Sequence, residues 1–159
     1  MYDFMKAAKE EAILGMNKGE IPVGAVIVKD GVIIGRAHNL KETLNDSTAH
    51  AEILAIKEAS KNIGSWRLNG AEMYVTLEPC PMCASAISQS RISKIYIGTF
   101  NKDMGACGSV INLLDNRGLN SFVQAKWVYD EECSTILTKF FTSRREVKEW
   151  LILDYQYYS

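Results

Sequence analysis

The amino-acid sequence predicts an α/β protein whose sheet is mixed and has about five strands. Residues 23–39 form two β-rich runs joined by Asp30 and Gly31, a pair that favours a tight turn between antiparallel strands. Residues 72–98 follow the order strand, helix, strand, which requires a crossover between two parallel strands. A sheet with both kinds of neighbour is mixed, and we expect helices on its faces.

The N-terminal half supplies two expected helices around this hairpin. Four apolar residues recur at helical spacing near the start of the chain: Phe4, Ala8, Ala12 and Met16. This first helix ends near Gly19. Residues 50–60 combine strong helix formers with small apolar residues, which predicts the second helix.

The C-terminal half alternates further strands and helices around a Gly-rich loop at residues 104–108. The expected elements are a strand over 71–78, a helix over 81–92, a strand over 94–100, a short helix over 110–114, a strand over 122–129 and a long helix over 130–151. No repeat, low-complexity tract or Pro/Ser-rich linker divides the chain, so we expect a single domain over residues 1–159.

The composition is that of a globular protein, since 47% of the residues are apolar and 23% are charged. A net charge of -1 gives no overall attraction to nucleic acid, so RNA binding would need a local basic patch. The N-terminus lacks the regions of a signal peptide, and no apolar run has the length of a membrane crossing. Four cysteines with one CxxC pair do not resemble a disulfide framework. These features predict a reduced, cytoplasmic protein with no membrane partner.

Three residues at two expected helix starts could bind one metal ion. His50 begins the helix over 50–60, and the small Ala51 leaves room around its imidazole. Pro81 fits the first turn of the next helix, which places Cys80 at the helix entrance and Cys83 one turn further on the same face. The helix dipole lowers the pKa of thiols at this position, and two thiolates with an imidazole select zinc.

The number of ligands separates a structural zinc site from a catalytic one. Structural zinc normally has four protein ligands, whereas three ligands leave a position for water. His38, Cys107 and Cys133 are the candidates for a fourth ligand, but none has another ligand-type residue at metal-binding spacing. A redox pair like that of thioredoxin would explain the CxxC and leave His50 and Glu52 without a role. We therefore expect three zinc ligands and an open position.

Glu52 would give such a site its chemistry. It follows His50 by two residues, so it does not share the histidine's helical face as a fourth ligand would. Its carboxylate can still lean toward a water whose pKa zinc lowers to about 7. A carboxylate there can accept the released proton and pass it to a leaving group. The alternative is a solvated surface glutamate, which the neighbouring ligand set disfavours.

The stretches "HAE" at 50–52 and "PCPMC" at 79–83 resemble the signature of the zinc-dependent nucleobase deaminases. Over residues 2–148 the chain resembles, more narrowly, the bacterial tRNA-specific adenosine deaminases, through "IPVGAVIV", "DSTAHAEI", "YVTLEPCPMCASAI", "GACGSVINLL" and "FFTSRR". The resemblance implies a cytidine deaminase-like three-layer α/β/α fold and a homodimer with one Zn2+ per subunit. It also implies that the wobble adenosine of a tRNA anticodon stem-loop is converted to inosine.

The same resemblance implies roles for individual residues of this sequence. His50, Cys80 and Cys83 would bind zinc, and Glu52 would move protons while water attacks C6 of the adenine. Asn39 matches a residue that contacts the base edge, where an amide can both donate and accept. The other positions implied to contact the substrate are Ala51, Asn101, Asn120, Phe141, Arg144 and Arg145.

Asn101 departs from the family pattern, because these enzymes more often carry an aspartate there that accepts a hydrogen bond from a ribose hydroxyl. A neutral amide keeps an acceptor but lacks the charge that favours the donor. Asp103, two residues further on, is the candidate substitute. We therefore expect a weaker preference for RNA over DNA and unchanged deamination chemistry.

The expected C-terminal helix carries the local basic patch. Residues 139–149 have a surplus of two positive charges, from Lys139, Arg144, Arg145 and Lys148 against Glu146 and Glu149. Phe140 and Phe141 add aromatic faces on which unstacked bases can lie, although a solvated helix face would carry the same charges. Two alternatives stay open: a deaminase of free guanine, cytosine or their nucleosides, which needs no RNA surface, and a non-catalytic zinc-binding RNA module, which needs no Glu52.

Overall fold

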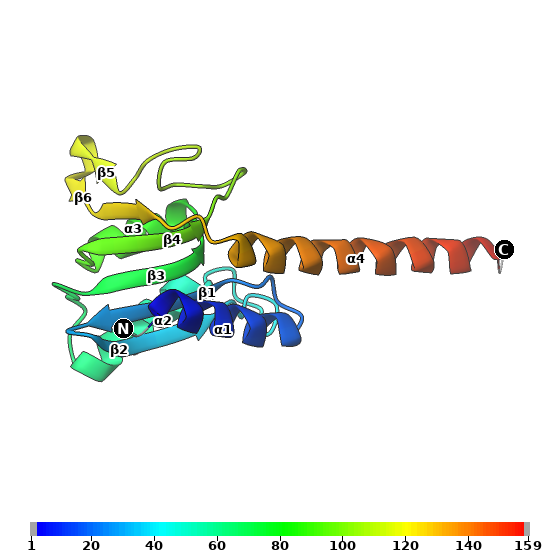
Figure 1. The fold of residues 1–159 in the computed structure, drawn as a ribbon, viewed down its shortest axis with the longest axis horizontal. Helices are drawn as coiled ribbons and strands as arrows, with labels where there is room; N and C mark the ends of the chain where they lie inside the picture. The colour runs from blue at the N-terminus through cyan, green and yellow to red at the C-terminus, as the bar shows by residue number, and fades with distance from the viewer. Residues whose placement is uncertain (1–2, 158–159) are drawn as a thin grey trace.

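The computed structural model describes the backbone of residues 3–157 and the side chains of residues 3–146. The strands of its central sheet are β1 Gly24–Lys29, β2 Val32–His38, β3 Glu72–Leu77, β4 Lys94–Thr99 and β7 Gln124–Trp127. They lie in the order β2-β1-β3-β4-β7 (Figure 1). β1 pairs antiparallel with β2 and β3, whereas β3 and β4, and β4 and β7, pair in parallel. The predicted mixed sheet is confirmed.

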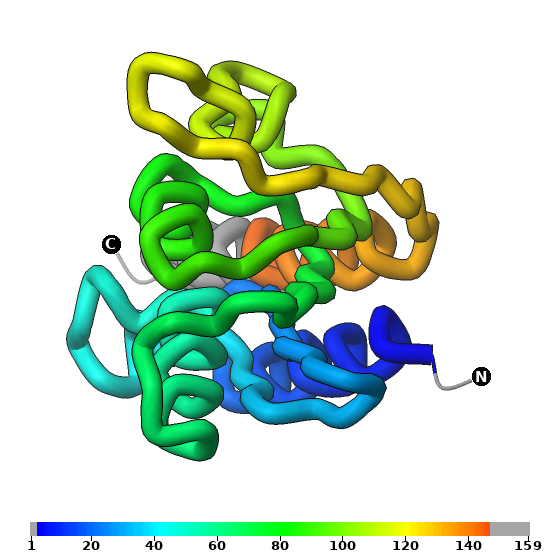
Figure 2. Tube along the Cα trace, turned by 90° about the vertical axis from the view of Figure 1, so that its left-hand side faces the viewer, coloured from blue at the N-terminus to red at the C-terminus, as the bar shows by residue number. Residues whose placement is uncertain are grey.

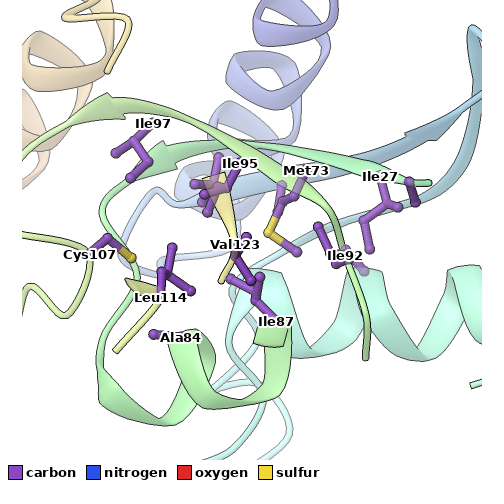
Figure 3. Packing of buried hydrophobic residues seen from close by; sticks show 14 of the residues in the cluster. Ile27, Met73, Ala84, Ile87, Ile92, Ile95, Ile97, Cys107, Leu114 and Val123 are labelled. Atoms are coloured by element: carbon purple, nitrogen blue, oxygen red, sulfur yellow. The ribbon is translucent and has the colours of Figure 1, made fainter. Parts of the chain in front are cut away.

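Helices cover both faces of this sheet and complete a three-layer α/β/α fold. Within the described backbone the α-helices are α1 Phe4–Asn17, α2 Ala51–Ile63, α3 Pro81–Gln89 and α4 Glu131–Tyr157. In Figure 2, α2 and α3 lie on one side of the sheet, and α1 and α4 lie on the other. Successive residues of β1 face opposite sides of the sheet. Ile27 packs in the cluster with α2 and α3, whereas Val26 packs in the cluster with α1. Figure 3 shows the larger core, in which Ile95 of β4 and Ile87 of α3 belong to one cluster.

The parallel strands all end at the same edge of the sheet. β3 leads into α3. β4 leads through Phe100 into the loop of residues 101–109, and β7 leads through residues 128–130 into α4. Open α/β sheets bind ligands outside the carboxyl ends of their strands, so this edge is where a site is expected.

The predicted helix over 110–114 was wrong. The side-chain oxygen of Asn112 accepts hydrogen bonds from the backbone N–H groups of Leu114 and Asp115, each at 3.1 Å. Such a local turn satisfies backbone donors outside a helix and therefore competes with it. The chain instead forms a small hairpin of β5 Asp115–Asn116 and β6 Ser121–Phe122 around the 3-10 helix η1 Arg117–Leu119.

Several other predicted boundaries shift, of which three have a clear structural setting. The strand expected over 122–129 is divided at Val123 into β6 and β7. α3 ends at Gln89, because the Ser90 hydroxyl donates back to the Ala86 carbonyl and Arg91 has a positive φ of 66°. α4 continues to Tyr157 rather than 151 and extends away from the sheet (Figure 1). Within residues 3–157, no helix combines the length and the apolar character that a membrane crossing requires.

Candidate metal centre and active site

His50, Cys80 and Cys83 meet at one point beside the carboxyl end of β3. His50 is the N-cap of α2, Cys80 is the N-cap of α3, and Pro81 occupies the first turn of α3 as expected. The ligand atoms of the three residues lie within 4.8 Å of one another. The two helix starts thus bring together residues that are thirty positions apart in the sequence.

The spacing of these atoms fits a single zinc ion. His50 Nδ1 lies 3.7 Å from the sulfur of Cys80 and 3.6 Å from the sulfur of Cys83. Tetrahedral zinc, with its usual bond lengths to nitrogen and sulfur, holds such atoms roughly 3.6 Å apart. Two sulfurs and one nitrogen are also the donor types that zinc prefers. The nitrogen-to-sulfur distances of the predicted ligand set therefore match those of a zinc site.

Hydrogen bonding within the cluster prepares one thiol as a thiolate. The hydrogen bond with Cys83 lowers the pKa of Cys80 to about 4, although burial opposes the shift. The same contact, together with burial, raises the pKa of the Cys83 thiol. A hydrogen bond with Cys80 also raises the pKa of His50. Zinc needs both thiolates and a neutral imidazole, so its binding releases protons from this cluster.

The described residues provide no fourth ligand. Among residues 3–146, the metal-binding group consists of His50, Cys80 and Cys83 alone. The His38 ring instead contacts Glu11, with Nδ1 2.7 Å from a carboxylate oxygen. Cys107 and Cys133 are buried free cysteines outside the group. The arrangement fits the expectation of three ligands with an open position.

Glu52 lies in the first turn of α2, buried to 4% exposure beside the metal-binding group. Burial raises the pKa of Glu52 to about 7, because a desolvated carboxylate is less stable than the neutral acid. A group with this pKa can both accept and return a proton near neutral pH. The solvated surface glutamate considered as an alternative is therefore wrong.

A cavity of about 320 Å³ opens onto the metal-binding group and Glu52. Its volume lies in the range of small-molecule sites. The sequence-predicted residues that line it are Asn39, His50, Ala51, Glu52, Cys80 and Asn101. Asn39 is only 8% exposed, and its side-chain oxygen accepts from the Lys41 N–H at 3.4 Å. The Asn101 side-chain oxygen accepts from the Met104 N–H at 3.0 Å.

The other predicted contact residues do not line this cavity. Asn120 ends η1 on the β5–β6 hairpin, and its backbone has the left-handed conformation. Phe141 and Arg145 are exposed on α4. Arg144 donates to the Gly19 carbonyl and stacks on the Phe140 ring at 4.9 Å, so it fastens α4 to the loop after α1. Their roles in substrate binding remain predictions.

Sequence reasoning also missed residues of the cavity wall. Glu78, Lys41, Met104 and Ile21 line the cavity, whereas the candidate substitute Asp103 is exposed and does not. An acidic residue directly after a buried strand was the one available signal for Glu78, because few acidic residues are fully buried without partners.

Comparison with family models shows which class of enzyme this protein belongs to. Residues 2–99 match the family model described as the cytidine and deoxycytidylate deaminase zinc-binding region. The match covers the three ligands, Glu52 and the strands that hold them. The fold and site are thus those of a zinc-dependent deaminase.

Individual relatives show which family within this class the chain belongs to. The chain is 48% identical over 147 residues to the tRNA-specific adenosine deaminase of Bacillus subtilis (strain 168), covering 92% of this chain and 91% of that protein. It is 49% identical over 142 residues to the corresponding protein of Aquifex aeolicus (strain VF5), covering 89% and 94%. A solved structure from work on A-to-I editing by tRNA:A34 deaminases has a TM-score of 0.81 at 41% identity, covering 84% of this chain and 98% of that chain. The chain therefore belongs to the family of tRNA-specific adenosine deaminases.

Replacing Cys83 with alanine should remove bound zinc and deaminase activity together. It should also lower thermal stability, because metal binding that requires the folded site adds its free energy to folding. Cys133→Ala is the matched control, since Cys133 is a buried free cysteine outside the ligand group and should leave the zinc content unchanged. Elemental analysis, thermal melts and activity assays on one preparation would check this. An active, metal-free Cys83→Ala protein would exclude a catalytic zinc.

Proposed function

We propose that this protein hydrolyses the wobble adenosine of a tRNA anticodon stem-loop to inosine and ammonia. The observation that carries the proposal is the position of Glu52, a buried acid that lines a cavity beside a metal-binding group of three residues. The tRNA-specific relatives, which match about nine tenths of the chain, support tRNA as the substrate.

The reaction assigns separate tasks to the residues of the cavity. His50, Cys80 and Cys83 would hold zinc, which when bound supplies the Lewis acidity that makes water a nucleophile near neutral pH. Glu52 accepts a proton from the attacking water and delivers it to N1 of the adenine. A second transfer through Glu52 protonates the amino group at C6, so that ammonia leaves and the inosine carbonyl remains. The amide of Asn39 lies at the cavity wall, where it can pair with the purine edge.

An RNA loop also needs a surface outside the cavity. We infer that Phe141, Arg144, Arg145 and Asn120 contribute to it, with base stacking on Phe141 and phosphate contacts from the arginines. Phe141 is 46% exposed, which leaves its ring accessible. The side chains of Lys148 and Glu149, counted in the basic patch, lie outside the described residues.

We further propose a homodimer of single-domain subunits in the cytoplasm. Leu119 and Phe122, both of the β5–β6 hairpin, are 59% and 65% exposed, and exposed apolar side chains of this size are available for a protein partner. One domain over residues 1–159 is supported by the continuous sheet, which combines strands from both halves of the chain. A cytoplasmic location follows from tRNA as the substrate.

The main alternative is a free-base deaminase. A guanine deaminase from Bacillus subtilis resembles the chain with a TM-score of 0.60 at 35% identity, covering 89% of this chain and 92% of that chain. The tRNA-specific relatives are more similar in sequence, and the tRNA:A34 deaminase structure superposes better. A non-catalytic zinc module is disfavoured because it would have no use for a buried glutamate beside the metal group.

The proposal predicts inosine at the wobble position of a defined tRNA. Zinc-loaded protein would be incubated with a set of transcribed tRNAs and with free guanine, cytosine and adenosine, and the products scored by mass spectrometry. The family resemblance leads us to expect conversion of an arginine tRNA whose anticodon begins with adenosine. Activity on free bases with none on any tRNA would favour the alternative.

Glu52→Gln should separate chemistry from binding. The amide is nearly isosteric but cannot accept and return protons, so the chemical step should slow by at least roughly 10²–10⁴-fold. Zinc content and stem-loop affinity should stay close to the wild-type values, because Glu52 is not one of the ligands. Single-turnover inosine formation, metal analysis and a binding titration would test these three expectations. Loss of zinc would make Glu52 a ligand, and a wild-type rate would assign the proton transfers to another residue.

Asn101→Asp should increase the preference for RNA over DNA. The Asn101 oxygen already accepts from the Met104 N–H, so the amide offers the substrate an NH2 donor. A carboxylate would offer a second acceptor to the ribose 2′-hydroxyl, worth about 1.4 kcal/mol or a factor of about ten. The measurement is the ratio of kcat/KM for a stem-loop and for its deoxy counterpart. Asp103→Asn is the control, and an unchanged ratio in Asn101→Asp would remove Asn101 from the sugar contact.

A further inference from the structure

Glu78 is a carboxylate with 1% exposure, two residues before the ligand Cys80, that the reaction above does not use. Its oxygens accept hydrogen bonds from the backbone N–H groups of Asn101, Cys107 and Ser109, at 3.1, 3.0 and 3.0 Å. The hydroxyl of Ser109 donates a fourth bond. All four donors belong to the loop of residues 101–109, which follows the neighbouring strand β4.

This loop forms one wall of the cavity. Asn101 and Met104 line the same cavity as His50 and Cys80 of the metal-binding group. The chain around Glu78 adds two backbone bonds to the same region, from the Glu78 N–H to the Thr99 carbonyl and from the Ala106 N–H to the Pro79 carbonyl, both at 2.9 Å. A Cβ at Gly105 would overlap the Glu78 carboxylate, so the loop closes around this group.

The position of the loop and the burial of Glu78 depend on each other. A carboxylate removed from water is costly unless hydrogen bonds replace its hydration. Among the ion pairs of the described residues, none involves Glu78, so the donors of the loop carry out this replacement. Charge-assisted bonds of this kind are about twice as strong as neutral ones. Without the carboxylate, three backbone N–H groups would lose their common acceptor.

We propose that Glu78 is a positioning residue for the substrate: it fixes the 101–109 loop and thereby sets where Asn101 and Met104 stand relative to the metal-binding group. This inference rests on the proposed function, since the wall matters only if a nucleotide occupies the cavity. Because Glu78 lies between β3 and Cys80, one short segment links the wall to the metal-binding turn. Glu78, which holds the wall, is thus only two positions from Cys80 in the metal-binding group, so the two parts of the site have a fixed relative position.

Glu78→Gln is the primary test. The amide has a single acceptor oxygen and turns an NH2 group toward N–H and O–H donors, so the loop loses its anchor. The expected result is an increase of roughly tenfold in KM for the stem-loop with kcat changed less than about threefold, because uniform substrate binding is lost. Zinc content should stay at the wild-type value. Hydrogen exchange of the 101–109 amides should accelerate, a readout that does not depend on activity.

Three further variants separate positioning from general destabilisation. Glu78→Asp keeps the charge on a shorter side chain and should restore part of the wild-type KM, and Ser109→Ala removes one of the four contacts and should have a smaller effect than Glu78→Gln. Glu11→Gln is the matched control, because Glu11 is also a buried carboxylate, bonded to Arg36 and His38 outside the cavity. It should lower thermal stability and leave KM unchanged.

The outcomes decide between two roles of Glu78. A Glu78→Gln protein with wild-type KM and wild-type exchange of residues 101–109 would overturn the proposal, as would a KM effect equal to that of Glu11→Gln. Selective loss of zinc in Glu78→Gln would also overturn it, since Glu78 would then act on the metal-binding turn. If wild-type protein forms no inosine in any stem-loop, the proposed function fails, while the exchange measurement still decides whether Glu78 anchors the loop.

Discussion

The convergence of two helix starts on one point is the constraint on which the rest of the structure depends. His50 and Cys80 occupy N-cap positions with extended backbone angles, yet neither side chain caps its own helix. N-cap side chains usually accept a hydrogen bond from the first turn, which adds about 1 kcal/mol of stability. Here both are directed toward each other and toward Cys83 instead. Two helices thus lack side-chain caps because their N-cap residues form the metal-binding group. The pairing of β1 with β3 holds the two helices in place.

Two buried glutamates near this group have different surroundings. Desolvation dominates at Glu52 and raises its pKa to about 7, which suits a group that exchanges protons. Glu78 instead receives four hydrogen bonds from a single loop. The cavity therefore combines a buried carboxylate of raised pKa with a wall that a second carboxylate anchors.

Much of this site could be predicted from the sequence because its signals are local. The hairpin at Asp30 and Gly31, the Pro81 helix start and the spacing of Cys80 and Cys83 each depend on a few consecutive residues. The apolar run at 110–114 was wrongly predicted to be helical. The hydrogen bonds of the Asn112 side chain form a turn there, and the spacing of apolar residues gives no sign of such a turn. Glu78 could not be assigned a role, because its partners follow it by 23 to 31 positions. The relation of Asn120 and Phe141 to the substrate depends on the tertiary arrangement, which no local pattern encodes.

On the proposed function, the cavity places the reacting groups and the wall that contacts the substrate on different segments. The ligands and Glu52 belong to helix starts whose backbone is fixed by the sheet, so their geometry tolerates little change. Asn101 stands on a loop that is held mainly through backbone N–H groups, and those contacts do not depend on which side chain the loop carries. On the proposed function, substitutions in the wall can therefore alter the contacts to the substrate while the reacting groups stay in place. The asparagine at 101, where the sequence resemblance leads us to expect an aspartate, is the kind of variation that such a division permits.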